Sequence, residues 1–270
     1  MRRYVALVVS SKGGVGKSTV AMQIVTPYLF IKNDFAQVAF YECDDENCDS
    51  YSYGASTLSK RAIIKVSDPY LYRNICAIFE EPNAVCIDVG GNKTTQIVLD
   101  ALEQSGMIHF VDVVFIPMLD GEQDAINASL VYNRIRLMNE SVPIFFVLNR
   151  VRARESLQMQ FENFFGDVHE IFEVPYAVCN YLQPYERENY ICIQESELFK
   201  HSRRFGLTIY EIASMRKDFL GELKRKGDRL SSKEMRLLSF KSYLERECKS
   251  FYRDHIAPLY RRLDEKLQRE

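Results

Sequence analysis

The sequence has 270 residues, a hydrophobic content of 47% and a formal net charge of −2. A chain of this length and composition can bury a sizeable core, and a single α/β domain of this size is ordinary. No apolar stretch is long enough to cross a bilayer, and the start Met1-Arg2-Arg3 leads into an apolar run without a signal-peptide cleavage region. We therefore expect a cytoplasmic protein without membrane-spanning helices.

The apolar run 4–9 is followed directly by a glycine-rich segment, an order typical of a buried strand, a phosphate-binding loop and a helix. The segment consists of Lys12, Gly13, Gly14, Val15, Gly16, Lys17, Ser18 and Thr19. Its glycines let backbone N–H groups point at phosphate oxygens, Lys17 adds a positive charge, and the Ser18 hydroxyl can ligate Mg²⁺. The N-terminus of the following helix also favours an anion. The segment predicts a nucleotide-binding protein.

This loop departs from the strict pattern because Ser11 stands where glycine is usual and because Lys12 is an additional lysine. With that lysine, residues 12–19 resemble the signature of the ParA/MinD family, deviant P-loop ATPases that dimerise around two ATP molecules. The resemblance implies that Lys12 crosses the dimer interface to the partner's nucleotide and stabilises charge during hydrolysis, like an arginine finger acting in trans. It also implies that Lys17 holds the β- and γ-phosphates within its own subunit.

The run 37–41 is a short predicted strand, and the acidic segment 42–47 follows it. This segment is similar to the family's Asp-x-Asp-Pro-Gln sequence, which implies that Asp44 helps to position the attacking water near Mg²⁺. Glu42, Asp45 and Glu46 depart from that sequence and make the segment unusually acidic. For Asp45 and Glu46, a solvated acidic loop is the alternative interpretation.

The apolar run 84–87 ends at Asp88, a pattern typical of a Walker B strand whose carboxylate reaches a water bound to Mg²⁺. The implied magnesium site therefore consists of Ser18, Asp44 and Asp88. In the following Gly90-Gly91 pair, Gly91 can bring a backbone N–H to the γ-phosphate, and a helix that would move on phosphate release starts at 92–94. Many family members have proline in this segment, so the glycine pair bears on the rate of hydrolysis.

Two further segments resemble the family's adenine-binding elements. The apolar run 142–148 ends at Asn149-Arg150, and the resemblance implies that the Asn149 amide reads an adenine edge. A guanine site would need an Asn-Lys-x-Asp set, which this chain lacks at 149–152. After the run 170–174, Pro175 matches a proline that lies along the base in the family.

The apolar runs 4–9, 37–41, 84–87, 111–117, 142–148 and 170–174 alternate with stretches of helix length. This alternation predicts an α/β fold with a mostly parallel, doubly wound sheet flanked by helices, as in P-loop NTPases. Ligands bind at the carboxyl ends of the strands in such sheets, where the loop and the predicted carboxylates fall. We expect an ATPase domain at 1–200 and a helical C-terminal extension at 201–270.

The charge divides between these two parts. Residues 1–199 have 16 Lys and Arg against 26 Asp and Glu, whereas residues 200–270 have 19 against 11, which gives net charges of −10 and +8. Such a basic part can neutralise DNA phosphates without reading sequence, but charged helix faces are as often solvated. The candidate cluster comprises Arg203, Arg204, Lys224, Arg225, Lys226 and Arg229.

From 231 to 270 the chain has the pattern of an amphipathic helix with Ser231 or Ser232 as N-cap and a possible bend at Pro258. Packing on the ATPase domain is the first interpretation of its apolar face, and contact with a partner helix is the second. A membrane-surface anchor is the third because Asp264, Glu265 and Glu270 dilute the positive charge that such a helix needs.

The seven cysteines form no Cys-x-x-Cys pair, and we expect them to be reduced and mostly buried. Iron–sulfur relatives of the family carry cluster cysteines, so this pattern argues against that branch. A redox or metal role for Cys43 and Cys48, beside the acidic segment, remains an alternative.

Three functional hypotheses follow from the resemblance. The first is a ParA-like partition ATPase that uses ATP and Mg²⁺, forms an ATP-dependent homodimer, binds DNA non-specifically and hydrolyses ATP slowly until a protein partner stimulates it. Such a protein would be cytoplasmic and associated with the nucleoid. The second is a MinD-like, conjugation-associated or secretion-associated positioning ATPase that acts at a membrane or an assembly. The third is a nucleotide-binding module that does not hydrolyse ATP.

Overall fold

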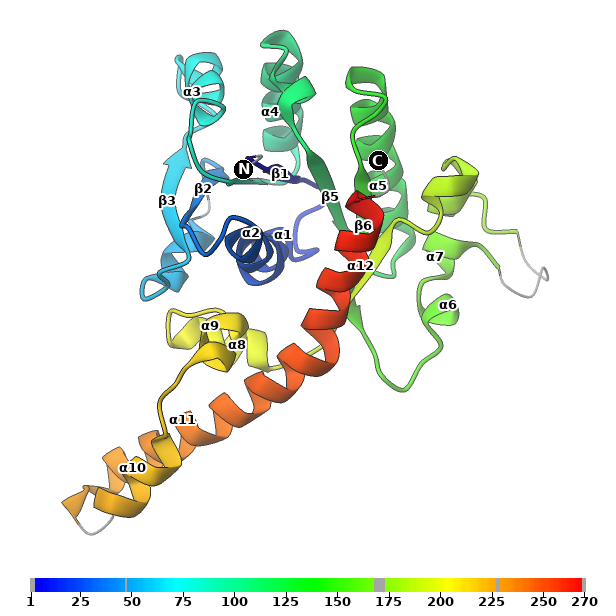
Figure 1. The fold of residues 1–270 in the computed structure, drawn as a ribbon. Helices are drawn as coiled ribbons and strands as arrows, with labels where there is room; N and C mark the ends of the chain where they lie inside the picture. The colour runs from blue at the N-terminus through cyan, green and yellow to red at the C-terminus, as the bar shows by residue number, and fades with distance from the viewer. Residues whose placement is uncertain (1–2, 47, 168–172, 227–228, 269–270) are drawn as a thin grey trace.

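The computed structural model describes residues 3–46, 48–167, 173–226 and 229–268. Its centre is a seven-stranded, all-parallel sheet with the strand order β3-β2-β4-β1-β5-β6-β7 (Figure 1). The strands are β1 (Val5–Val8), β2 (Val38–Cys43), β3 (Ser59–Ile64), β4 (Val85–Val89), β5 (Val113–Met118), β6 (Ile144–Val151) and β7 (Tyr190–Gln194). The doubly wound sheet predicted from the sequence is confirmed.

Helices cover both faces of this sheet because the central strands are apolar on both sides. One buried cluster joins the sheet to α3 (Leu71–Ile78), α4 (Lys93–Gln104), α5 (Glu122–Met138) and the short helices α6 (Leu157–Gln160) and α7 (Glu162–Phe165). A second cluster joins it to α1 (Lys17–Val20), the π-helical η1 (Ala21–Val25), α2 (Thr26–Lys32), α8 (Leu198–Arg204), α9 (Ile209–Ser214) and the C-terminal helices. Short 3₁₀ turns complete the connections: η2 (Asp49–Tyr53), η3 (Met107–Phe110), η4 (Val178–Asn180) and η5 (Pro184–Glu186).

Strand register brings the predicted site together at the carboxyl edge of the sheet. Val8, at the end of β1, pairs with Asp88 of β4, and Asp88 pairs in turn with Glu42 of β2. The phosphate loop, the acidic segment and Asp88 therefore start from three adjacent strands at one level. This edge is where open parallel sheets bind their ligands.

The strand predictions are right in the centre of the sheet and wrong at its edges. The runs at 4–9, 37–41, 84–87, 111–117 and 142–148 correspond to β1, β2, β4, β5 and β6. In the predicted strand 170–174, residues 170–172 lie outside the described residues, and 173 and 174 are not in a strand. The two edge strands, β3 and β7, were not predicted. In β3, Ser59, Lys60 and Arg61 interrupt the apolar pattern, and the apolar run 190–193 of β7 was not assigned to a strand although it is as long as the run 84–87.

The C-terminal region is helical, as predicted. It consists of α10 (Phe219–Lys226), α11 (Ser232–Phe251), a π-helical turn η7 (Tyr252–Ile256) and α12 (Ala257–Leu267). Ser231 is the N-cap of α11 and forms a reciprocal capping box with Glu234. Pro258 lies in the first turn of α12, directly after the π-helical turn, where its missing N–H is tolerated.

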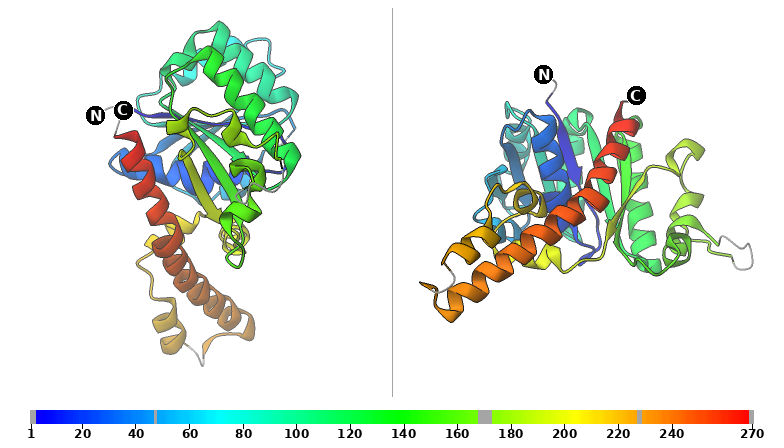
Figure 2. Two further views of the ribbon diagram at one scale, coloured as in Figure 1. Left: turned by 90° about the vertical axis from the view of Figure 1, so that its right-hand side faces the viewer. Right: turned by 60° about the horizontal axis from the view of Figure 1, so that its bottom comes forward.

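The two halves of this long helical rod have different surroundings. Leu244, Cys248, Ile256, Leu259 and Leu263 are buried in the same cluster as α1 and α2, so the second half packs on the α/β domain. The first half, with α10 beside it, extends away from the domain (Figures 1 and 2). We call residues 219–226 and 229–243 the helical arm.

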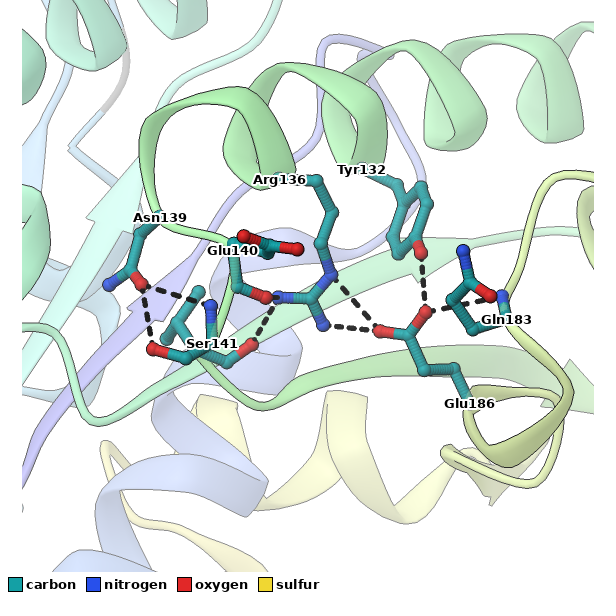
Figure 3. A network of polar contacts seen from close by, with 8 residues as sticks. Tyr132, Arg136, Asn139, Glu140, Ser141, Gln183 and Glu186 are labelled. Carbon is teal, nitrogen blue, oxygen red and sulfur yellow. Dashed lines mark hydrogen bonds and ion pairs between the residues drawn. The ribbon is translucent and has the colours of Figure 1, made fainter.

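A buried polar network anchors the segment that leads into β7 (Figure 3). The Glu186 carboxylate is almost fully buried and accepts hydrogen bonds from the Tyr132 hydroxyl at 2.5 Å and from Arg136 Nε at 3.0 Å. A second guanidinium nitrogen of Arg136 forms an ion pair with the same carboxylate. Burial and the Glu186 hydrogen bond raise the pKa of Tyr132 to about 12. This network ties the turn before the edge strand to α5 and so fixes the position of β7.

Candidate nucleotide-binding site

The glycine-rich loop has a backbone that only glycines adopt without strain. Gly14 and Gly16 have φ values of 80° and 90°, in the left-handed region. A Cβ at Gly16 would also lie 2.3 Å from Asn149 Nδ2, so close contact with β6 excludes any side chain there. The Lys17 ammonium folds back and donates a hydrogen bond to the carbonyl oxygen of Lys12 at 3.0 Å. The backbone conformation of the loop therefore depends on its glycines, and the Lys17 side chain folds back onto it.

Lys17 lies among carboxylates and close to the predicted phosphate-sensing segment. Burial lowers its pKa, and the nearby charges of Asp88 and Asp44 oppose that effect. A Cβ at Gly91 would be 3.3 Å from Lys17 Nζ and 3.5 Å from Gly13, so Gly91 lies directly against the loop. The structure brings Lys17 and Gly91 together, as expected for two groups that bind one phosphate.

Asp88 is 2% exposed, and the Ser18 hydroxyl is near enough to its carboxylate to lower its pKa. Burial raises its pKa to about 7, while the Ser18 hydroxyl and the Lys17 charge act in the opposite direction. Its second oxygen, Oδ1, is buried without a hydrogen-bond partner among the described residues. A buried acceptor with no protein donor suits a water bound to Mg²⁺, so the pair Ser18 and Asp88 fits the predicted metal site.

The structure separates the roles of Asp44 and Asp45. Asp44 lines the cavity in front of the loop, and a Cβ on Gly90 would lie 2.8 Å from its Oδ2 atom. Asp45 is turned toward β3, where its Oδ1 accepts from the backbone N–H groups of Val66 at 2.7 Å and Ser67 at 3.2 Å. Asp44 is therefore the carboxylate placed at the site, and Asp45 fixes the loop. Asn47, the last residue of the predicted acidic motif, lies outside the described residues.

Glu42, a departure from the family sequence, has a structural role that the sequence did not indicate. It is 3% exposed, and its carboxylate accepts from Asp49 N at 2.7 Å and from Ser50 at both its backbone nitrogen (3.1 Å) and its hydroxyl (2.5 Å). These contacts satisfy the buried charge and hold the start of η2. As a result, Asp49 also borders the cavity.

Two cavities meet at the loop. The larger one, about 590 Å³, lies between the loop, Asp44, Asp88 and the 90–94 segment. The smaller one, about 330 Å³, lies between the loop and the residues that follow β6 and β7. Gly16 and Thr19 line both cavities. A molecule with a phosphate end and a second, nonphosphate end can occupy both at once.

The smaller cavity contains Asn149 and Arg150 but not Pro175. The buried Asn149 amide donates to the carbonyl oxygen of Val15 at 2.8 Å and accepts from Arg150 N at 2.9 Å, so it ties β6 to the loop; its base-reading role stays a prediction. Pro175 is exposed before η4 and lines neither cavity. Its placement along the base stays a prediction, and the residues that line the smaller cavity from the strand next to β6 are 194–197, after β7.

Lys12 is only partly buried and faces α5 of its own subunit. Burial raises the pKa of Asp124 in the first turn of α5, and the Lys12 charge acts in the opposite direction. Asp124 Oδ1 is buried without a hydrogen-bond partner among the described residues. In this single chain, Lys12 is therefore close enough to Asp124 for the two charges to interact, and it forms no ion pair among the described residues.

The predicted basic cluster is divided in the structure. Arg203 points into the molecule, where it pairs with Asp49 at 2.9 Å, whereas Lys224, Arg225, Lys226 and Arg229 lie exposed on the helical arm. Long-range contacts of this kind have no local sequence signal, so Arg203 and Asp49 were not predicted as site residues. No helix among residues 3–46, 48–167, 173–226 and 229–268 is long and apolar enough to cross a membrane.

Comparison with known proteins gives a fold match without a sequence match. No protein-family model and no curated protein matches the sequence. The chain is similar to McdA from Cyanothece in complex with ATP, with 13% identity over 78% of this chain and 90% of that chain and a TM-score of 0.51. For apo McdA the identity is 14%, the coverage 78% and 93%, and the TM-score 0.52.

A third similar structure is a Borrelia burgdorferi B31 protein described as a plasmid partition protein and bound to AMPPNP. The identity is 14%, the coverage 83% of this chain and 96% of that chain, and the TM-score 0.52. At these identities the similarity establishes a shared fold. The chain has the fold of the ParA/MinD-type P-loop ATPases. In this fold, residues 12–16 of the sequence motif lie in the loop between β1 and α1 and residues 17–19 begin α1, at the place where the two cavities meet.

Proposed function

We propose that the protein is a ParA/MinD-type ATPase that binds ATP between these two cavities and hydrolyses it. The observation that carries this proposal is the meeting of Lys17, Asp44 and Asp88 around one cavity at the end of a glycine-rich loop. These groups lie at or after the ends of three adjacent strands, and a structural turn alone would not need a half-buried lysine close to two carboxylates. Two of the three similar structures hold ATP or AMPPNP, which supports the same ligand class here.

The triphosphate would occupy the larger cavity and the adenosine the smaller one. Backbone N–H groups of the loop and of α1 face the first cavity, together with the Lys17 ammonium. The second cavity offers the Asn149 amide and the polar residues 194–197 after β7. Because Gly16 and Thr19 border both, the α-phosphate would lie beside them.

Ser18, Asp44 and Asp88 would hold Mg²⁺, directly or through its waters. When bound, Mg²⁺ would neutralise charge on the β- and γ-phosphates and would lower the cost of ionising the buried Asp88. Three groups of the chain itself would act on the reaction. Asp44 would accept a hydrogen bond from the attacking water and orient it, and Lys17 would stabilise charge on the γ-phosphate. The Gly91 N–H would donate a hydrogen bond to the same phosphate.

We further propose that ATP closes a homodimer in which Lys12 reaches the partner's nucleotide. In support, Lys12 is only partly buried and forms no ion pair among the described residues, and the nearby carboxylate of Asp124 on α5 has an oxygen without a hydrogen-bond partner among them. A lysine that is not fixed by an ion pair can reorient toward another group at low cost. Dimerisation would therefore complete each active site with a second lysine.

The partition-type function rests on the helical arm. Its residues 219–226 and 229–243 contain seven Lys and Arg against two Asp and Glu, a net charge of +5. The exposed side chains of Lys224, Arg229, Lys233 and Arg236 have no carboxylate partner among the described residues. A protruding helical pair with unpaired cations can contact DNA phosphates independently of sequence. We propose that this arm is the DNA-binding surface of the ATP-bound dimer, and that a protein partner stimulates hydrolysis to release it.

A positioning ATPase that acts at a membrane is the second candidate. The observation in its favour is that Leu220, Met235 and Leu237 are also exposed on the arm, so that it is apolar as well as basic. Sedimentation with anionic vesicles in the presence of ATP tests it, and recovery of the protein in the supernatant would exclude this version.

Nucleotide binding and turnover test the proposed ATPase directly. We expect the wild-type protein to bind ATP more tightly than GTP in titration calorimetry and to release phosphate slowly with Mg²⁺ and DNA. Lys17→Ala should lose at least roughly tenfold in ATP affinity, because a buried charge-assisted contact to phosphate is removed. Lys93→Ala is the matched control, since Lys93 borders the same cavity from an exposed position. ATP binding without any turnover would favour the non-hydrolysing module.

A further inference from the structure

Arg203 joins α8 to the loop that follows the acidic segment. Its guanidinium pairs with Asp49 Oδ1 at 2.9 Å, donates to the Ser52 hydroxyl at 2.7 Å and lies over the Tyr53 ring with 5.7 Å to the ring centroid. All three partners belong to η2. Through this one side chain, α8 contacts three residues of η2.

The two members of this ion pair border different cavities. Asp49 lines the larger, phosphate-side cavity, and Arg203 lines the smaller cavity on the other side of Gly16 and Thr19. Asp49 is also close enough to Lys17 to influence its pKa, after burial, Asp88 and Asp44. The ion pair therefore spans the place where a bound nucleotide would pass from one cavity to the other.

Gln23, in the π-helical turn that continues α1, adds a second connection at the same place. It is fully buried and donates to the Tyr53 hydroxyl at 3.1 Å and the Ser202 hydroxyl at 3.0 Å, and it accepts from Ile209 N at 2.8 Å. The amide of one residue thus links the phosphate-loop helix, η2, α8 and α9. A π-helical turn inside an α-helix often marks a functional site.

The opposite side of α8 contacts the helical arm. His201 and Phe205, two residues before and after Arg203, both make ring contacts with Phe240 of the arm, at centroid distances of 5.3 and 6.1 Å. Lys241 of the arm also lies over the Phe205 ring. The short helix α8 therefore has η2 on one side and the arm on the other.

We propose that the Asp49–Arg203 ion pair is a nucleotide-sensitive contact that transmits occupancy of the ATP site to the helical arm. A polyphosphate has opposite effects on its two members, because it repels Asp49 and attracts Arg203. Nucleotide binding therefore weakens the pair and loosens α8 against η2, while Gln23 still joins the two, and the contacts of His201 and Phe205 carry the change to Phe240. The state with the ion pair closed and the state with it open therefore differ in their interaction with the nucleotide, as a population shift requires. The inference rests on the proposed ATP site.

Two carboxylates of the phosphate-side cavity provide a matched pair of variants. Asp49→Asn removes one negative charge and the partner of Arg203, whereas Glu46→Gln removes one negative charge from an exposed residue that lines the same cavity and has no ion pair among the described residues. Both variants reduce repulsion of the phosphates. Only Asp49→Asn opens the contact with α8.

Hydrogen exchange of the full chain, with and without AMPPNP, tests the inference. We expect AMPPNP to speed exchange at residues 198–214 and at 236–243 in the wild-type protein and in Glu46→Gln. Asp49→Asn should show the faster exchange without nucleotide and little further change with it. If wild-type protein that binds AMPPNP shows no change at 198–214, or if Asp49→Asn behaves like Glu46→Gln, the inference is wrong. Failure of the wild-type protein to bind AMPPNP in calorimetry would instead contradict the proposed ATP site.

Discussion

Asp44 occupies the space that a side chain at residue 90 would need. A Cβ built on Gly90 would lie 2.8 Å from Asp44 Oδ2 and 2.9 Å from Asp44 Cγ. The Gly90-Gly91 pair, which departs from the proline-containing sequences of the family, is thus a steric requirement of this site. The absence of a Cβ at Gly90 leaves room for the Asp44 carboxylate, which would orient the attacking water. The absence of a Cβ at Gly91 leaves room for the Lys17 ammonium.

The first prediction concerns this contact. Gly90→Ala should push Asp44 out of position and lower the rate of ATP hydrolysis at least roughly tenfold, as small displacements of positioning groups do. ATP affinity should change less than the rate, because Lys17 and the loop are untouched. Phosphate release and calorimetry measure the two effects. Gly54→Ala is the control, since a Cβ there meets its nearest atom at an ordinary 3.6 Å. Equal rates for Gly90→Ala and the wild-type protein would mean that Asp44 does not act from its observed position.

The second prediction is a pH dependence of stability caused by Asp88. Its pKa is about 7 in the folded protein and near 3.8 when unfolded, so the folded state binds the proton more tightly. The stabilisation is complete below pH 4 and is lost as the pH rises toward 7, by at most about 4 kcal/mol. Urea unfolding of nucleotide-free protein should show this loss in the wild type and a flatter profile in Asp88→Asn. Parallel profiles for the two proteins would exclude Asp88 as the cause.

The third prediction separates the two lysines of the loop. Lys12→Ala should keep ATP binding but fail to form the ATP-dependent dimer, because Lys12 is expected to act on the partner's nucleotide. Lys17→Ala should lose ATP binding itself, since Lys17 lies inside its own cavity. Light scattering after gel filtration with AMPPNP measures the dimer, and calorimetry measures affinity. The same defect in both variants would remove the distinct role of Lys12.

The fourth prediction concerns the network that holds β7. Arg136→Met leaves the buried Glu186 carboxylate without its cation and should lower the free energy of unfolding by about 3–5 kcal/mol. Arg134→Met, on the same helix, removes exposed ion pairs with Asp100 and Glu103 and should cost no more than about 1 kcal/mol. Urea unfolding at neutral pH compares them. Similar losses for both would show that the network does not stabilise the fold.

The centre of the fold could be predicted because its strands are buried on both faces and therefore appear as continuous apolar runs. The loop between β1 and α1 was equally clear, since its residue pattern is local. The edge strands β3 and β7 were missed, β3 because Ser59, Lys60 and Arg61 interrupt its apolar pattern and β7 because its short run 190–193 was not assigned to a strand. Residues 194–197, which follow β7, line the smaller cavity, whereas Pro175 does not.

The parts of the site that escaped prediction depend on distant contacts. Glu42 looked like an unusual substitution, but its longer side chain reaches the backbone of Asp49 and Ser50. Arg203 looked like one of several cations in a basic stretch, yet it pairs with a residue 154 positions earlier in the chain. Charge patterns in sequence do not show which cations face solvent, whereas the structure shows that Lys224, Lys233 and Arg236 on the helical arm are exposed and have no ion pair among the described residues.

The most direct test of the account is DNA binding by the Asp44→Ala protein, which should retain ATP. Binding of an arbitrary duplex is measured with ATP, with ADP and without nucleotide across a salt series, and again after Lys233→Ala and Arg236→Ala are combined in the arm. We predict binding with ATP alone, a steep loss of affinity with salt, and a weaker affinity with a smaller salt dependence for the arm variant. No binding in any nucleotide state, or binding that the arm substitutions leave unchanged, would contradict a DNA-binding ATPase that acts through this arm.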